Sequence, residues 1–259
     1  MIEALQLLLN TFAPWLWAGG LVALRIGAAV FLLPAFGAIV VPMRVRLAMA
    51  FALTLVVTPA VAAAGTLPPN GFGDFSRALL SETLIGLAMG FSIRLVVWIL
   101  QIAGSIAAQS TSLSQLLGVA SVDPQPAMAQ VFAVAGIALA MMAGFHTQIA
   151  AALIQSYQLF PLGELPSVAP ISEWAVREIA WAFGLAFSLS APFAIASLLY
   201  NMALGAINRA MPQLMVAFVG APAITAGGLA LLAIAAPLIL TLWLTHMNRV
   251  LDFPFSFGQ

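Results

Sequence analysis

The stretch AINRAMPQLMVAF, residues 206–218, separates two long apolar runs in the last quarter of the chain. It gathers Arg209, Pro212 and Gln213 in a sequence that is otherwise almost entirely apolar. Proline has no backbone N–H, and it disfavours a helical conformation of the residue before it. We therefore predict that a helix ends near residues 205–206 and that these three residues form a bent corner that contacts protein. The alternative is a simple interfacial turn with Arg209 among lipid headgroups.

The composition on either side of this stretch is that of an integral membrane protein. The 259 residues are 63% hydrophobic and 6% charged, whereas about 25% of the residues of a soluble domain are charged. All eight basic residues are arginine and the formal net charge is zero, which argues against a nucleic-acid partner. Cysteine is absent, so disulfides and thiolate chemistry are excluded. No basic segment precedes the first apolar run, and we expect that run to be a retained span.

Six apolar segments are long enough to cross a membrane, because the ~30 Å hydrocarbon core needs roughly 20 helical residues. They cover about 12–33, 45–65, 78–105, 127–152, 175–204 and 220–246. Lipid offers no hydrogen bonds, so each segment must satisfy its own backbone. We predict an all-α integral membrane protein with a single membrane domain over residues 1–259. The arginines of the predicted loops divide evenly between the two sides and give no orientation.

Several of these segments contain helix breakers. They are Pro59, Pro192, Pro237 and the pair Gly227-Gly228, and a further pair, Gly220 and Pro222, follows the opening stretch. A proline removes an intrahelical hydrogen bond and usually bends the helix. We therefore expect broken and hairpinned helices. The alternative is that proline and glycine are simply common in membrane helices.

The segment GSIAAQSTSLSQLLGVASVDPQP, residues 104–126, is rich in serine, glutamine and small residues and contains a single acid, Asp123. It is too polar to cross lipid comfortably and too apolar to be a solvated linker. Segments of this kind line cavities or are buried against other protein.

Enzyme motifs are missing from the chain: it has no G-x-S-x-G, P-loop, H-E-x-x-H or dinucleotide-binding pattern. His146 and His246 lie far apart in the sequence without adjacent acids. We therefore expect no catalytic, metal or cofactor site, although a membrane enzyme built from scattered residues is an alternative. A small-molecule transporter would also use broken helices, but it should show two pseudo-symmetric halves, and none is visible.

In the third apolar segment, Glu82, Gly86, Gly90 and Arg94 recur every four residues and form one stripe along a helix. The two glycines permit close approach of another backbone. A charge facing lipid costs at least ~2.5–3.5 kcal/mol, so both charges need partners on another helix or chain. Arg25 is a possible mate for Glu82. We predict that the stripe and Arg25 contact other subunits; an ordinary helix interface with snorkelling ends is the alternative.

NRAMPQL (208–214), followed by a short apolar run, V-G-x-P and a glycine-rich final span, resembles the FliR family of flagellar export-gate proteins. ALRIGAAVFLLPAFGAIVVPMRVRLAMAFALT (23–54) is similar to the opening region of that family, and ETLIGLAMGF (82–91) is similar to its E-x-x-x-G-x-x-x-G-F helix. Gly104, Gln109, Asp123-Pro124, GFH (144–146) and SYQLFPLG (156–163) follow in the family's order. Met215 and Ala217 depart from the asparagine and phenylalanine usual in the family, and the spacing of 110–122 also differs. These differences affect the expected local contacts and not the resemblance to the family.

The resemblance implies a non-enzymatic pore component of the flagellar type III export gate, at the basal body in the bacterial inner (cytoplasmic) membrane. Such proteins pass unfolded flagellar subunits across that membrane. They form a helical hetero-oligomer with FliP- and FliQ-type membrane proteins and contact an FlhB-type export protein. By the same resemblance, residues 106–122 of the polar segment form the pore plug, and Asp123-Pro124 fixes where the plug meets the next helix. The plug candidates are Gln109, Ser110, Thr111, Ser112, Ser114, Gln115, Asp123 and Pro124. An injectisome export protein of the same family is the alternative.

Overall fold

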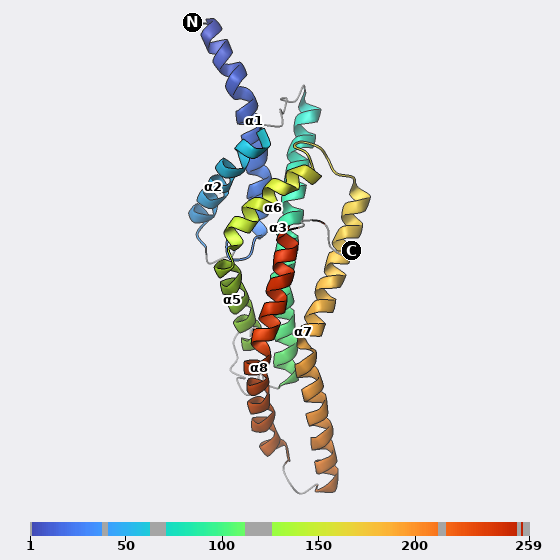
Figure 1. The fold of residues 1–259 in the computed structure, drawn as a ribbon. Coiled ribbons are helices and arrows are strands. Elements are labelled where there is room, and N and C mark those ends of the chain that lie inside the picture. The colour runs from blue at the N-terminus through green and yellow to red at the C-terminus, as the bar shows by residue number, and fades with distance from the viewer. Residues whose placement is uncertain are drawn as a thin grey trace. The chain divides into compact units, whose positions relative to one another are not determined.

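The computed structural model describes residues 2–37, 41–62, 71–111, 126–211, 216–252 and 255. Every regular element in these ranges is an α-helix (Figure 1). The helices are α1 (Ile2–Leu32), α2 (Met43–Ala62), α3 (Phe72–Ser110), α5 (Ala127–Met142), α6 (Phe145–Leu159), α7 (Val168–Ala210) and α8 (Val216–Asp252). The prediction of an all-α protein is confirmed.

Five helices of the described ranges are long and apolar enough to cross a membrane alone, and α5 with α6 gives a sixth candidate as a bent pair. The predicted number of apolar helical segments is therefore confirmed, but the fourth segment is not continuous over 127–152. Its two halves meet at an angle of 75°. Gly144, between them, has a φ of 85°, a left-handed conformation that glycine adopts without the steric penalty of a Cβ atom.

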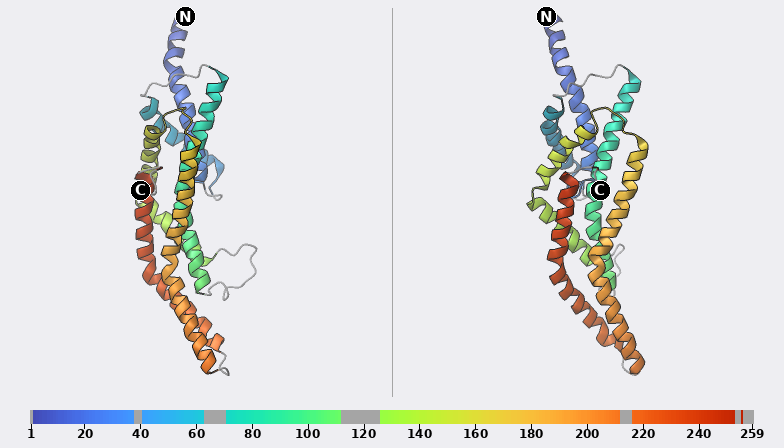
Figure 2. Two further views of the ribbon diagram at one scale, coloured as in Figure 1. Left: turned by 90° about the vertical axis from the view of Figure 1, so that its right-hand side faces the viewer. Right: turned by 45° about the vertical axis from the view of Figure 1, so that its right-hand side comes forward.

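The proline positions do not end their helices. Pro59, Pro192 and Pro237 lie inside α2, α7 and α8, and Pro222 also lies inside α8, so the predicted break at Gly220 and Pro222 is wrong. A single lost hydrogen bond is tolerated because any longer non-helical stretch would leave more backbone groups unpaired in lipid. Figure 2 shows α7 and α8 as long antiparallel helices, with α8 curving along its course.

The end of α7 also lies later than predicted. The helix continues to Ala210, and the N–H of Met211 donates to the carbonyl oxygen of Ile207 at 2.8 Å. Arg209 therefore belongs to the last helical turn rather than to a corner that begins at 206. The restriction that Pro212 imposes falls on the residue directly before it, so the helix can continue to Ala210.

The contacts of the chain divide it into two compact units. The first comprises Met1–Leu95, Ala143–Glu178 and Met247–Gln259, and the second comprises Val96–Met142 and Ile179–His246. In the first unit α2 contacts both α1 and α6, around the buried side chains Val22, Ile26, Ile85, Met89, Phe145 and Leu153. In the second unit the indole Nε1 of Trp243 donates to the carbonyl oxygen of Val96 at 2.6 Å in an apolar core. The single membrane domain stays a prediction.

Candidate functional site

The first unit contains a fully buried ion pair between two helices. Arg25 of α1 and Glu82 of α3 are each 0% exposed, and Arg25 Nε lies 2.7 Å from Glu82 Oε2. Arg25 Nη2 also donates to Glu82 Oε1 at 3.1 Å, so the pair is bidentate. Two parallel charge-assisted hydrogen bonds fix the relative orientation of the two side chains as well as their distance.

Residues of α6 and of the loop after it complete the coordination of both charges. Arg25 Nη1 donates to Ser156 Oγ at 3.0 Å, and Nη2 donates to the carbonyl oxygen of Phe160 at 3.0 Å. Glu82 Oε1 accepts from the backbone N–H of Gly163 at 2.9 Å. The guanidinium carbon lies 3.6 Å from the centre of the Tyr157 ring. We call Arg25, Glu82, Ser156, Tyr157, Phe160 and Gly163 the ion-pair cluster.

The cluster joins four separate segments of the first unit: α1, α3, α6 and the loop that leads to α7. Removing two charges from water costs several kcal/mol per ion, and the attraction between them offsets this only when further hydrogen bonds satisfy both groups. Here serine, backbone carbonyl and backbone N–H groups supply those bonds. The cluster therefore specifies one arrangement of these segments and offers no open position for a substrate.

The glycines of the predicted stripe lie where α3 meets α1. A Cβ atom added at Gly86 would lie 2.9 Å from Ala28 Cβ, and one added at Gly90 would lie 2.6 Å from the carbonyl oxygen of Ala29. These distances are shorter than real Cβ contacts, so only glycine permits this approach of the two helices. At the end of the stripe, Arg94 Nη1 donates to the carbonyl oxygen of Leu32 at 3.3 Å.

The structure thus gives Arg25, Glu82, Gly86 and Gly90 neighbours within this chain. Contacts with other subunits stay a prediction for the stripe, and at these four positions such contacts would have to be indirect. Arg209 is exposed at the end of α7. Pro212 and Gln213 lie outside the described residues.

Of the plug candidates, Gln109 and Ser110 belong to the last turn of α3 and Thr111 follows it. Gln109 is exposed, whereas Thr111 is buried. The hydroxyl groups of Ser110 and Thr111 donate to the carbonyl oxygens of Ile106 and Ala107, at 2.8 and 3.0 Å. The other candidates, Ser112, Ser114, Gln115, Asp123 and Pro124, lie outside the described residues.

Two glycines of the second unit lie against Thr111 and Ala129, the one before and the other after residues 112–125. A Cβ atom at Gly228 of α8 would lie 2.5 Å from Thr111 Cγ2, and a Cβ atom at Gly104 of α3 would lie 2.7 Å from the backbone nitrogen of Ala129 in α5. Thr111 therefore directly follows the end of α3, and Ala129 of α5 lies beside α3 at the level of Gly104. Gly104 and Thr111 are seven positions apart along the chain, a rise of about 10 Å at 1.5 Å per residue.

Several residues of these sites carry no strong sequence signal. Ser156, Phe160 and Gly163 lie in SYQLFPLG, a stretch whose order along the chain supported the family resemblance but whose role was not predicted. Two of the bonds they make use backbone atoms, which leave no trace in residue identity. His246 packs against Trp181 with ring centroids 5.3 Å apart, and the described residues contain no cluster of three metal-ligating side chains.

Comparison with known proteins gives a consistent result. Residues 16–250 match the family described as "Bacterial export proteins, family 1". The chain is 32% identical over 248 residues to the flagellar biosynthetic protein FliR of Caulobacter vibrioides, covering 94% of this chain and 99% of that protein. It is 28% identical over 233 residues to FliR of Aquifex aeolicus, covering 88% of each. It is also 28% identical over 224 residues to FliR of Escherichia coli, covering 83% of each.

Proposed function

We propose that this chain, which belongs to the family of bacterial export proteins, family 1, is a non-enzymatic pore component of the flagellar type III protein export gate. Membership of the family makes the chain part of flagellar protein export. Beyond this membership, we propose that the chain forms part of the pore and that unfolded flagellar subunits pass through this pore. We also propose that the chain lies in the inner membrane at the basal body.

The apolar surface of the chain supports a membrane-embedded assembly. Large apolar side chains are exposed along α7 and α8, among them Phe183, Phe187, Leu198, Met202 and Leu238. An exposed apolar surface of this extent is incompatible with water and marks contact with lipid or with other subunits. FliP- and FliQ-type membrane proteins and an FlhB-type export protein are the partners that we propose for it. Arg94, Arg209, Pro212 and Gln213 are the proposed positions for direct contact with them.

The close contacts of Thr111 and Ala129, before and after residues 112–125, are the observation that supports the pore role. Thr111 is held against Gly228, and Ala129 is held against Gly104, so both of these described residues have fixed neighbours. A plug must be anchored while its middle moves. Small and polar side chains such as those of 112–125 can leave a closed position without a large desolvation penalty, whereas a packed apolar plug would resist opening.

A deletion tests this role. Removing Ser112–Ser114 should make the membrane permeable to small ions while the protein still assembles with its partners. Ion leakage would be measured in cells that express the complete set of gate proteins, with the amount of assembled complex determined from the same cells. An intact barrier in a correctly assembled deletion variant would exclude the plug.

A further inference from the structure

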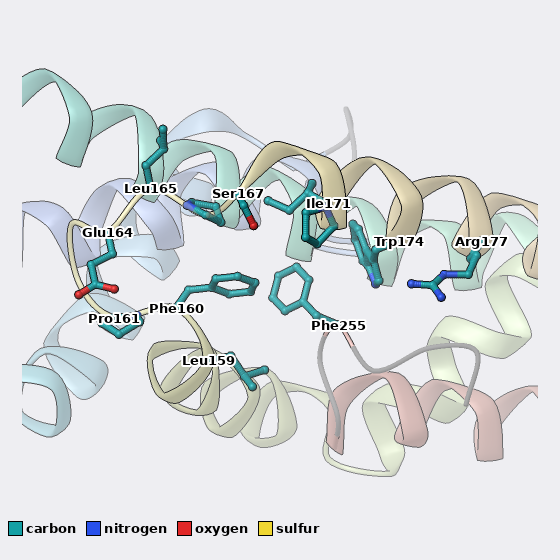
Figure 3. Close-up of a pocket in the computed structure, with 12 residues that line it drawn as sticks. Leu159, Phe160, Pro161, Glu164, Leu165, Ser167, Ile171, Trp174, Arg177 and Phe255 are labelled. Atoms are coloured by element: carbon teal, nitrogen blue, oxygen red, sulfur yellow. The ribbon is translucent and has the colours of Figure 1, made fainter.

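A pocket of about 420 Å³ lies in the first unit, between the loop after α6 and the first turns of α7. We call it the loop pocket; its lining includes Phe160, Pro161, Glu164, Trp174, Arg177 and Phe255. In the close-up of Figure 3, Glu164 lies at one end and Arg177 at the other, with the aromatic rings between them. The pocket therefore has an apolar centre and opposite charges at its two ends.

The aromatic rings form a connected wall. Phe255 meets Phe160 edge to face with ring centroids 5.0 Å apart, and it meets Trp174 with centroids 5.1 Å apart. Rings in contact at such distances stabilise one another. The wall is therefore a preformed apolar surface.

One donor in this wall lacks an acceptor. Trp174 is only 7% exposed, and its buried indole Nε1 has no hydrogen-bond partner among the described residues. Arg177 lines the same pocket, and it lies three residues further along α7 and thus on the same side of the helix; Figure 3 draws its guanidinium on the side to which the indole nitrogen points. A buried donor without a partner is costly. Two adjacent donors, one of them cationic, favour an anionic oxygen between them.

The position of the pocket along α7 indicates where such an anion is found. At 1.5 Å per residue, the 43 residues of α7 extend about 64 Å, whereas the hydrocarbon core of a membrane is only ~30 Å thick. Glu173, Arg177 and Glu178 lie together near its start, and charges are expelled from the hydrocarbon. This end of α7 therefore belongs at headgroup depth, where tryptophan and arginine are favoured.

We propose that the loop pocket binds the headgroup of a membrane glycerophospholipid. The phosphodiester oxygen accepts from Trp174 Nε1 and from Arg177, and the aromatic wall contacts the glycerol carbons. Glu164, exposed at the opposite end, accepts from the terminal ammonium of phosphatidylethanolamine or a terminal hydroxyl of phosphatidylglycerol. Phosphatidylcholine carries the same phosphodiester without a terminal donor, so the pocket discriminates against it. This inference does not depend on the pore role.

Native mass spectrometry of the full chain in detergent, with each of the three lipids added in turn, tests the site. Trp174→Phe keeps the ring and removes the donor, and Arg177→Gln removes the charge. Each of these two variants should lower the affinity for one bound phosphatidylethanolamine or phosphatidylglycerol molecule about tenfold, since a hydrogen bond to a charged group contributes about that factor. Glu164→Gln, an exposed change that folding does not need, should abolish the preference over phosphatidylcholine. Glu173→Gln, a nearby charge outside the pocket lining, should change neither quantity.

Two results would overturn the proposal. Equal retention of all three lipids, unaffected by Trp174→Phe and Glu164→Gln, would mean that only non-specific lipid surrounds the chain. Displacement of the lipid by inorganic phosphate at an equal concentration would mean that the pocket selects a soluble anion instead. Thermal unfolding of each variant, recorded on the same sample, separates loss of the site from loss of the fold.

Discussion

Arg25 Nε lies 2.7 Å from Glu82 Oε2 between α1 and α3, and neither side chain has any exposed surface. The two residues are far apart in sequence, and they are the only charged residues of the ion-pair cluster. Because every other member of the cluster is neutral, each charge depends on the other. The ion pair therefore holds the segments that form the cluster in a single arrangement.

Breaking the pair from one side should be strongly destabilising. Arg25→Met or Glu82→Leu leaves the remaining charge buried and uncompensated, which costs about 3–5 kcal/mol. The double variant removes both charges and should lose clearly less than the sum of the two single variants. The measurement is the free energy of unfolding in detergent for wild type, both single variants and the double variant.

Arg44→Met provides the control for the loss of an arginine, because Arg44 is exposed in the first turn of α2. It should leave the unfolding free energy within about 0.5 kcal/mol of wild type. Strictly additive single-variant effects would contradict an energetic coupling between Arg25 and Glu82.

Leucine at Gly86 or Gly90 should force α3 away from α1. The Cβ atom alone would lie within 3.0 Å of atoms of α1 at both positions, and overpacking of this kind costs about 1–3 kcal/mol or more. Gly27→Leu is the matched control, since nothing lies within 4 Å of a Cβ atom there. Unfolding in detergent should separate the stripe variants from the control, and equal stability of all three would show that close approach is not required.

Adjacent glycines in α8 provide a direct test of the proposed plug. Alanine at Gly228 would place its Cβ atom 2.5 Å from Thr111 Cγ2, whereas alanine at Gly227 would meet nothing within 4 Å. Both substitutions raise helix propensity by the same amount, about 1 kcal/mol. Gly228→Ala should therefore displace Thr111 and increase ion leakage, while Gly227→Ala should not.

Leakage would be measured with the complete set of gate proteins present in the membrane. Equal leakage from both variants, or no leakage from either variant in fully assembled complexes, would show that Thr111 does not contribute to the permeability barrier.

Arg209→Ala should weaken assembly without weakening the chain. Arg209 is exposed at the end of α7, and an exposed charge contributes little to folding. Its loss should reduce the amount of FliP- and FliQ-type partner that copurifies with the chain while thermal unfolding of the isolated chain is unchanged. Normal copurification would indicate that Arg209 lies among lipid headgroups instead.

The fold class and the number of apolar segments could be predicted from the sequence because both follow from apolar length and from backbone hydrogen bonding in lipid. The pairing of Arg25 with Glu82 was one option that the sequence offered, since charges within apolar segments need partners. The close approach at Gly86 and Gly90 followed from their spacing, although the helix that uses it was not identified.

Other features could not be predicted, for identifiable physical reasons. The break at Gly144 lies in a continuous apolar run without proline, where a single glycine is no clear signal. α7 passes the predicted end near 206 because Pro212 acts on its immediate neighbour only. The roles of Phe160 and Gly163 depend on backbone atoms, and the loop pocket depends on Trp174 meeting Phe255 across the sequence.

Co-purification tests the export-gate account most directly. The chain would be coexpressed with the FliP- and FliQ-type proteins of the same genome, purified by a tag on this chain alone, and weighed intact by native mass spectrometry. The account predicts one large species that contains both partners and a single copy of this chain. A monomer or a small homo-oligomer that contains neither partner would contradict it.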